Sequence, residues 1–194
     1  MNFQARWRAF LTEGGNVFKG ERVGPIPLEF IEPTLERYYE ELGRLFPQQS
    51  AFFQTIEPLG SVGKKAKSGD IDLAIDVSEL APSRKIDDQM LQSWELNPQA
   101  WADTRARFAK RARKATDEEL DLRAFLYELA KYIGENSQII KTDLKKVTSG
   151  GMFSLFPQIS DSGEQQEIGI QVDWMLGNKD WLKFAYFSDV PSAD

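Results

Sequence analysis

The stretch from Leu59 to Asp76, LGSVGKKAKSGDIDLAID, carries the most specific pattern of the chain. Its second half alternates apolar and polar residues, which predicts a strand with one buried face and one open face. The core-facing set is Ile71, Leu73, Ile75 and Val77, and the opposite set is Asp70, Asp72, Ala74 and Asp76. The sequence therefore predicts a half-buried strand with three carboxylates on its open face.

Two of these carboxylates have a spacing that suits phosphate chemistry. Asp70 and Asp72 leave such a strand on the same side, about 7 Å apart for two residues of an extended chain. That distance can straddle two divalent cations, as in-line phosphoryl transfer requires. The upstream turn at Gly60 and Ser61 offers backbone amides and a hydroxyl, and Lys64 adds positive charge, as a triphosphate needs. Together these parts predict nucleotidyl transfer.

Composition limits the chemistry further. The chain of 194 residues contains no Cys and no His. Disulfides, thiolate zinc sites and Ser-His-Asp catalysis are therefore excluded. Any metal site must be built from oxygen ligands, which favours Mg²⁺, Mn²⁺ or Ca²⁺. The length is typical of one domain, and we expect a single domain over residues 1–194.

Charge and hydropathy narrow the possible partners. The net charge of −6 argues against a protein that coats nucleic acid indiscriminately, although it allows a local basic patch. No apolar run approaches the roughly 18 residues of a membrane span. The N-terminus lacks the apolar segment of a secretory signal. We expect a cytoplasmic protein without a membrane partner.

Periodicity predicts the remaining elements. Helical spacing is found over residues 2–12, 28–46 and, in one long pattern, 98–133, with a loop and a short helix over 81–97. Strands are expected over residues 51–59, 70–77, 138–148, 152–156 and 167–175. In the last of these, Asp173 and Gln171 lie on the face opposite Ile170 and Val172. The expected class is α+β, a small mixed sheet with helices on one face and the carboxylates on the other.

The Gly-Ser turn followed by Asp-Ile-Asp resembles the nucleotidyltransferase superfamily of the DNA polymerase β type. The wording GSVGKKAKSGDIDLAI is closest to the family X polymerases. The resemblance covers residues 50–77 and the strand around Asp173. It implies a polymerase β-like catalytic core that transfers a nucleoside monophosphate from an NTP to an acceptor hydroxyl and releases pyrophosphate.

The resemblance also implies a role for each matched residue. Asp70 and Asp72 would hold two Mg²⁺ or Mn²⁺ ions, and Asp173 would complete the metal site beside the attacking hydroxyl. The phosphates of the NTP would bind at the turn, through Gly60, Ser61 and Lys64. The acceptor stays open among an RNA end such as that of a tRNA, a nucleotide and a small molecule. The gap between the serine and the first acid is short, and little chain remains for a C-terminal helical substrate domain.

Two other functions fit the same residues. A catalytically silent nucleotidyltransferase fold could bind nucleotides or partners without releasing pyrophosphate. A metal-dependent phosphodiesterase could use the same acids with water as the nucleophile, but it would leave the lysine-rich turn without a purpose. An Asp-x-Asp pair on a strand is, taken alone, often only solvated. Asp76 lies about 13 Å beyond Asp72 and would be solvated or salt-bridged.

A basic cluster, RARFAKRARK, spans residues 105–114 of the otherwise acidic chain. On one long helix its cations form a stripe beside an apolar face, as contacts with a phosphate backbone require. This stripe consists of Arg107, Lys110, Arg111 and Lys114. It either contacts nucleic acid or is a solvated helix face whose charges pair with the acids at 117–121.

Overall fold

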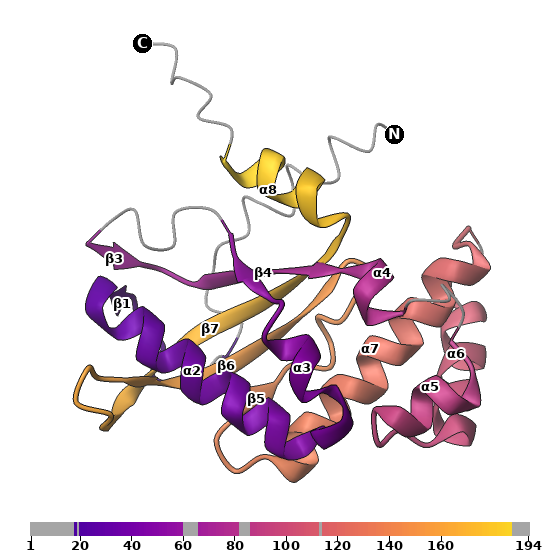
Figure 1. The fold of residues 1–194 in the computed structure, drawn as a ribbon. Coiled ribbons are helices and arrows are strands. Elements are labelled where there is room, and N and C mark those ends of the chain that lie inside the picture. Colours follow the sequence, from indigo (N-terminus) through magenta and orange to yellow (C-terminus); the bar gives the residue numbers. More distant parts are fainter. Residues whose placement is uncertain (1–17, 19, 60–65, 82–85, 113, 188–194) are drawn as a thin grey trace.

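The strand that carries Asp72 lies inside a mixed sheet (Figure 1). The computed structural model describes residues 18, 20–59, 66–81, 86–112 and 114–187. Within them the strand order of the sheet is β2-β4-β7-β6-β5. The strands are β2 (Glu57–Pro58), β4 (Ile71–Asp76), β5 (Lys141–Thr142), β6 (Gly151–Ile159) and β7 (Gln165–Gly177). β4 and β7 are parallel and the other pairs antiparallel, so the expected α+β class with a mixed sheet is confirmed.

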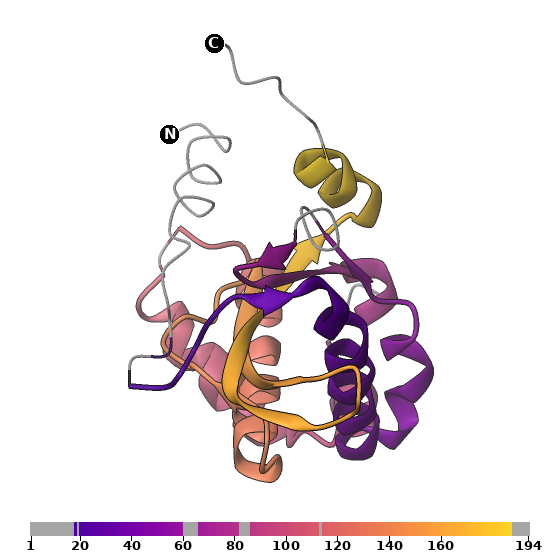
Figure 2. The same cartoon turned by 90° about the vertical axis from the view of Figure 1, so that its left-hand side faces the viewer.

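Helices cover the two faces of this sheet unequally (Figures 1 and 2). The long helices α2 (Leu28–Leu45) and α7 (Asp117–Asn136) lie on one face, and α8 (Lys179–Phe187) lies on the other. The shorter elements are β1 (Ile26–Pro27), η1 (Pro47–Gln49), α3 (Ser50–Phe53), β3 (Lys67–Ser68), α4 (Val77–Leu80), α5 (Asp88–Ser93) and α6 (Pro98–Ala109). β1 and β3 pair with each other outside the main sheet.

The core lies between the sheet and the long helices. Ile71, Leu73 and Ile75 of β4 are completely buried, which confirms the predicted alternation. Val77 does not extend this row, because β4 ends at Asp76 and α4 begins at Val77.

Polar contacts fix α2 against the sheet. The buried hydroxyl of Thr34 accepts a hydrogen bond from the backbone N–H of Ile159 at 2.8 Å. Tyr38 accepts from the indole N–H of Trp174 at 3.1 Å and also bonds to the hydroxyl of Ser154 at 2.8 Å. Because the Ser154 hydroxyl donates to a β7 carbonyl, Tyr38 is the donor in the second bond. The predicted helix over 28–46 is thereby confirmed and tied to β6 and β7.

The strand predicted over 51–59 is wrong. Its first residues form α3, and only Glu57–Pro58 pairs with β4. The buried residues of this segment, Phe53, Ile56 and Leu59, are three apart from one to the next, which is not the alternation of a strand. The ring of Phe53 packs against Trp94 and Trp174. Aromatic packing therefore decides the conformation here, over the apparent period of two.

The single helix predicted over 98–133 is two helices, α6 and α7. Thr116 begins α7 with a capping box. Its hydroxyl accepts from the N–H of Glu119, and the Glu119 carboxylate accepts from the N–H of Thr116. These reciprocal bonds satisfy two amide groups that a helix start leaves free. Phe108 and Leu120 then pack together, which closes α6 against α7.

The strand predicted over 138–148 shrinks to β5. Asp143 turns the chain directly after it, because its carboxylate accepts a hydrogen bond from the N–H of Lys145 at 2.9 Å. A tight turn before β6 follows, closed by a bond from Thr148 to Gly151. The strands predicted over 152–156 and 167–175 are confirmed and extend further in β6 and β7. The helix predicted over 2–12 lies outside the described residues.

Two adjacent tyrosines allow a test of the polar contacts that hold α2. Tyr38→Phe leaves the indole N–H of Trp174 without a partner, so we expect the free energy of unfolding to fall by about 1–3 kcal/mol. The matched control is Tyr39→Phe, because the buried Tyr39 hydroxyl has no partner among the described residues. Its removal should leave stability unchanged or slightly raised. Chemical denaturation of both variants measures this, and equal losses would contradict the assigned network.

Candidate functional site

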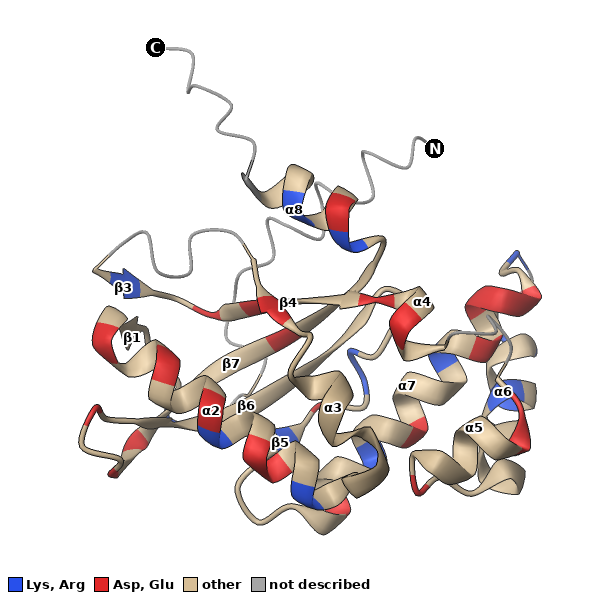
Figure 3. Ribbon diagram, in the orientation of Figure 1, with Lys and Arg blue, Asp and Glu red and all other residues tan. Residues whose placement is uncertain are grey.

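The register between β4 and β7 brings two of the predicted acids together. Asp72 is paired directly with Asp173 on the neighbouring parallel strand. Side chains paired in this way leave the same face of the sheet, with their strands about 4.8 Å apart. Asp70 comes just before the first residue of β4, and the hydroxyl of Ser68 fixes it by donating to its carbonyl at 2.8 Å. Figure 3 shows acidic positions on both adjacent strands.

This acidic face is less open than predicted. Asp173 is only 6% exposed, and Asp70 and Asp72 are half-buried. The reason is α8, which covers the carboxyl ends of β4 and β7. Leu182 of this helix is completely buried in a small cluster with Leu59, Ala74 and Met175. The expectation that helices cover only one face is therefore wrong.

Polar contacts hold α8 in this position. The side chain of Asn178 caps the helix by accepting from the N–H of Trp181 at 2.9 Å. Glu57 of β2 pairs with Lys179 at 3.1 Å and with Lys183 at 2.5 Å. The hydrogen bond from Lys183 and, more weakly, the contact with Lys179 lower the pKa of the Glu57 carboxyl, against an opposing effect of burial. α8 is thus fastened to the edge strand beside the acids.

Asp76 was predicted to be solvated or salt-bridged, but it has a structural role as the acceptor of backbone hydrogen bonds. One carboxylate oxygen accepts from the N–H of Ser78 at 2.8 Å, and the other accepts from the N–H of Lys179 at 3.0 Å. Asp76 therefore caps α4 and also holds the start of α8. Burial alone would raise the pKa of Asp76, but the hydrogen bonds from Ser78 and Lys179 outweigh it, so the pKa is lowered.

The pKa values of the three candidate acids are raised instead of lowered. Burial, reinforced by the charge of Asp70, raises the pKa of Asp72 to about 7. Burial raises the pKa of Asp173 to about 8; a hydrogen bond from Gln171 opposes this, and the charges of Asp72 and Asp70 add to it. The pKa of Asp70 is also raised, mainly by burial. In the part of the chain that the structure describes, no cation offsets the crowding of these like charges.

One oxygen of the cluster lacks any partner. Asp173 accepts a hydrogen bond from Gln171 on Oδ2 at 2.9 Å, while Oδ1 is buried without a partner among the described residues. A buried and unpaired carboxylate oxygen costs free energy unless a cation or donor meets it. An all-oxygen donor set is also what Mg²⁺ or Mn²⁺ takes, so the residues present fit such an ion.

The carboxylates of the cluster do not converge on a common point. Within the described ranges no three acidic side chains are close enough to share a metal ion. Binding of a cation would require the side chains to rotate inward.

Sequence reasoning missed Tyr186 of α8. Its ring packs on the cluster of Leu59, Ala74, Met175 and Leu182. In this cluster, Ala74 and Met175 each lie two residues beyond one of the paired acids. Burial raises the pKa of the Tyr186 hydroxyl, and the charges of the three acids raise it further. The signal was present in the sequence, since Asn178 is a helix cap and Leu182 and Tyr186 have a spacing of four.

The predicted triphosphate turn lies outside the described residues, because Gly60, Ser61 and Lys64 fall in the gap at 60–65. The residue that leads into it is described. The N–H of Leu59 donates to the carbonyl of Asp72 at 2.8 Å. The chain therefore enters the turn directly beside the acidic pair.

The basic stripe does not lie on one helix. α6 ends at Ala109, so that only Arg107 lies in it, while Lys110 caps it and Arg111 and Lys114 follow in the connection to α7. The guanidinium of Arg107 lies 4.7 Å from the ring centre of Tyr127. All four side chains are exposed, and none has an ion pair with a described residue. The pairing predicted with the acids at 117–121 is made instead by Arg105, with Asp117 and Asp121.

Comparisons with known proteins add no family assignment. No protein-family model matches the sequence, and no curated protein is significantly similar to it. In the described part of the chain, no helix combines the length and apolar character needed to cross a membrane.

The raised pKa values predict a stability that depends on pH. The Asp173 carboxyl titrates near 8 in the folded chain against 3.8 in its ordinary state. Between these values the folded state holds the extra proton, so stability falls as pH rises from about 4 to about 8. Asp173→Asn imitates the protonated form. With a chelator present it should match the wild type at pH 4 and have the higher melting temperature at pH 9.

The control for this prediction lies on the neighbouring strand. Asp76→Asn removes a carboxylate whose pKa is lowered, so it should reduce the melting temperature at pH 9. Thermal unfolding of the three proteins across this pH range measures both signs. A destabilised Asp173→Asn protein at pH 9 would show that Asp173 is stabilised as an anion, contrary to the assignment.

Proposed function

We propose that the protein is a metal-dependent nucleotidyltransferase with a polymerase β-like core. The observation that carries this proposal is the direct pairing of Asp72 with Asp173 on parallel strands, with Asp70 at the entrance of the same strand. The unpaired and buried Oδ1 of Asp173 supports a cation at this place. The Gly-Ser turn with Lys64, which begins one residue after Leu59, supports a triphosphate beside it.

Each residue then has a defined task. Asp70, Asp72 and Asp173 would hold two Mg²⁺ or Mn²⁺ ions. Such ions, when bound, lower the pKa of an attacking hydroxyl and neutralise the charge that develops on the phosphates. Gly60, Ser61 and Lys64 would bind and orient the β- and γ-phosphates of the NTP. The acceptor oxygen would attack the α-phosphorus, and pyrophosphate would leave.

The helix α8 supports this reaction through its position. Its apolar cluster, completed by Tyr186, covers the carboxyl ends of β4 and β7 and keeps bulk water from one side of the acids. Electrostatic interactions strengthen where water is excluded. The attachment of α8 to Glu57 and Asp76 keeps this cover in place without using the three acids themselves.

The test is a transfer assay with matched variants. Wild-type protein with Mg²⁺ or Mn²⁺ and each radiolabelled NTP, offered total RNA and a metabolite extract, should release pyrophosphate and label an acceptor. Asp72→Asn should reduce turnover by about a hundredfold or more, because it removes a charge that acts in the transition state. The control is Asp88→Asn, which changes an exposed carboxylate of α5.

The outcomes separate the candidate functions. Turnover by Asp72→Asn near the wild-type level at saturating Mg²⁺ would refute the two-metal assignment. Binding of Mg²⁺ and NTP without pyrophosphate release would support a silent binding module instead. Labelled acceptors lost on Asp72→Asn but kept on Asp88→Asn would support transfer at the paired acids.

The exposed cations at the end of α6 and in the connection to α7 allow a test of an RNA acceptor. If they contact a phosphate backbone, changing all four to Gln should flatten the slope of log K against log salt by up to about 0.7 per lost contact with a single strand. NTP affinity should not change, since these residues lie far along the chain from the predicted triphosphate residues Gly60, Ser61 and Lys64. The variant changes Arg107, Lys110, Arg111 and Lys114.

Its control removes the same number of cations elsewhere on the surface, at exposed positions of other elements. The control set is Arg37, Lys131, Lys145 and Lys146. Fluorescence anisotropy with labelled RNA at several salt concentrations gives both slopes. Equal slopes for the two variants would mean that the cluster is only a solvated surface.

A further inference from the structure

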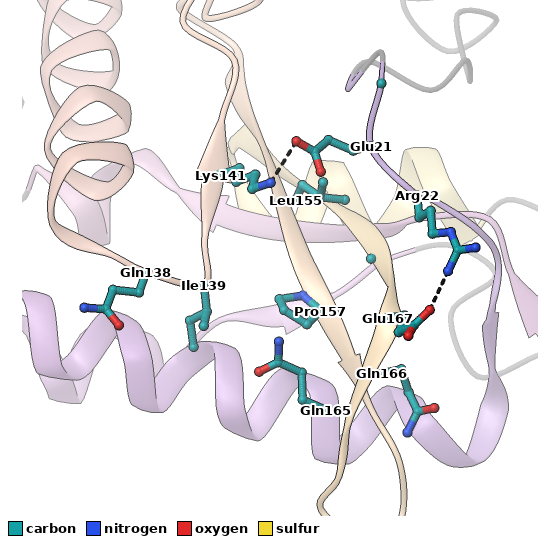
Figure 4. A pocket seen from close by; sticks show the side chains of 12 residues that line it. Glu21, Arg22, Gln138, Ile139, Lys141, Leu155, Pro157, Gln165, Gln166 and Glu167 are labelled. Atoms are coloured by element: carbon teal, nitrogen blue, oxygen red, sulfur yellow. Dashed lines mark hydrogen bonds and ion pairs between the residues drawn. The ribbon is translucent and has the colours of Figure 1, made fainter.

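A hollow lies on the same sheet, away from the paired acids (Figure 4). It encloses about 460 Å³, within the range of about 300–1,000 Å³ that small-molecule sites occupy. Its floor is formed by Leu155 and Pro157 of β6 and Gly169 of β7. The three acids do not line it.

Strand register places this hollow on the acidic face. Across β6 and β7, Phe153 is paired with Asp173, Leu155 with Gln171 and Pro157 with Gly169. Residues two apart leave the same face, so the floor continues the row that contains Asp173. Gly169 lies four residues before Asp173, about 13 Å along β7. Gln171 lies between Gly169 and Asp173 on this face and is only 7% exposed, so a ligand in the hollow reaches the acids only by passing over this side chain.

One wall of the hollow is held in place by backbone contacts. β4 pairs with β7 only from Val172 onward. Before that point the segment at 22–24 takes its place, because the N–H of Gly169 donates to the carbonyl of Arg22 at 2.8 Å and the N–H of Gly24 donates to the carbonyl of Gly169 at 3.1 Å. From the core side, the amide of Gln158 donates to the carbonyl of Gly24 at 3.0 Å.

The opposite wall is the segment that leads into β5. It contributes Gln138, Ile139 and Lys141. The ammonium of Lys141 pairs with Glu21 at 2.7 Å and so joins the two walls. The second ion pair, between Arg22 and Glu167, joins the wall at residues 22–24 to β7. Figure 4 shows both ion pairs.

The chemistry of the lining selects a class of ligand. Its two described cations and two described anions are paired with each other, so the described lining offers no free charge to a phosphate group. None of the described lining residues is aromatic, so a nucleobase would find no ring among them to stack on. The remaining polar groups are the amides of Gln138, Gln165 and Gln166, each of which can donate and accept hydrogen bonds.

An apolar floor bordered by amides suits a molecule with both C–H faces and many hydroxyls. We infer that this hollow binds a neutral, hydroxyl-rich ligand, namely an oligosaccharide, which serves as the acceptor. The role as acceptor rests on the proposed nucleotidyl transfer, whereas the binding does not. The distance of about 13 Å from Gly169 to Asp173 calls for a chain of sugar rings rather than a single ring.

The reaction at such an acceptor balances without a further reagent. A hydroxyl oxygen of the sugar forms a bond to the α-phosphorus of the NTP. The bond from that phosphorus to the oxygen of the β-phosphate breaks, and pyrophosphate leaves. The proton of the hydroxyl passes to solvent.

The experiment measures binding first and transfer second. Full-length protein is titrated by calorimetry with neutral trisaccharides, namely maltotriose, cellotriose, xylotriose and N-acetylchitotriose, and with a trinucleotide as the charged comparison. At least one trisaccharide should bind, with or without Mg²⁺. Replacement of Gln138, Gln165 and Gln166 by Ala should weaken its binding by about tenfold or more, since each lost hydrogen bond contributes to affinity.

Two controls isolate the hollow. A triple variant with Ala at the exposed positions Gln54, Gln92 and Gln99 should bind like the wild type. Asp88→Asn in α5 should also keep the binding, because Asp88 does not line the hollow. Circular dichroism verifies that all variants are folded. The bound trisaccharide is then offered with each labelled NTP and Mg²⁺ and examined for a labelled product.

Every outcome decides between the two proposals. Failure of all trisaccharides to bind, or preference for the trinucleotide, would overturn the saccharide site and leave nucleotidyl transfer standing. Trisaccharide binding without labelling, in a protein that labels another acceptor, would overturn the acceptor role. Binding with no transfer to any acceptor would refute the proposed function and leave the saccharide site in place. Binding that the first triple variant keeps would place the sugar elsewhere.

Discussion

The parallel pairing of β4 with β7 is the constraint on which the candidate site depends. The buried row of Ile71, Leu73 and Ile75 faces the helices, and Val172 and Trp174 lie on the same side of β7. A slip of one residue would turn every one of these side chains toward the other face. Apolar packing therefore fixes the register, and the register in turn sets Asp72 opposite Asp173. Stability and the placement of the acids come from the same interactions.

The placement of Asp72 opposite Asp173 has an electrostatic cost, because both carboxylates are at least half-buried and close to each other. Burial and mutual charge oppose ionisation of Asp72 and Asp173, while Asp76 on the same strand is stabilised as an anion by backbone donors. The two carboxylates differ in their hydrogen-bond partners. Asp76 accepts from the backbone N–H groups of helices, whereas one oxygen of Asp173 has no partner among the described residues. Carboxylates whose pKa values are raised in this way are typical of functional sites.

The sequence was most informative where one physical effect dominates. Alternation in β4 is a local pattern of burial, so it predicted both the strand and the side on which its acids lie. It failed at 51–59, because contacts of Phe53 with Trp94 and Trp174 come from distant segments. The capping box at Thr116 was readable, yet the apolar period of 98–133 concealed the break. Coverage of the acids by α8 depends on Glu57, Asp76 and the helix start meeting in space, which no local pattern contains.

The length of β7 joins these features into one surface. Its C-terminal half pairs with β4 and carries Asp173, and near Gly169 the segment at 22–24 replaces β4 as its neighbour. The exchange changes the chemistry of the face, from clustered carboxylates to paired ions and amides. A strongly acidic surface repels phosphate unless cations are bound, whereas the neutral region does not distinguish by charge. Under the two proposals, the two ends of β7 would bind different molecules, a charged donor with its cations and a neutral acceptor. Because both ends share a rigid backbone, the distance between them is fixed by the sheet itself.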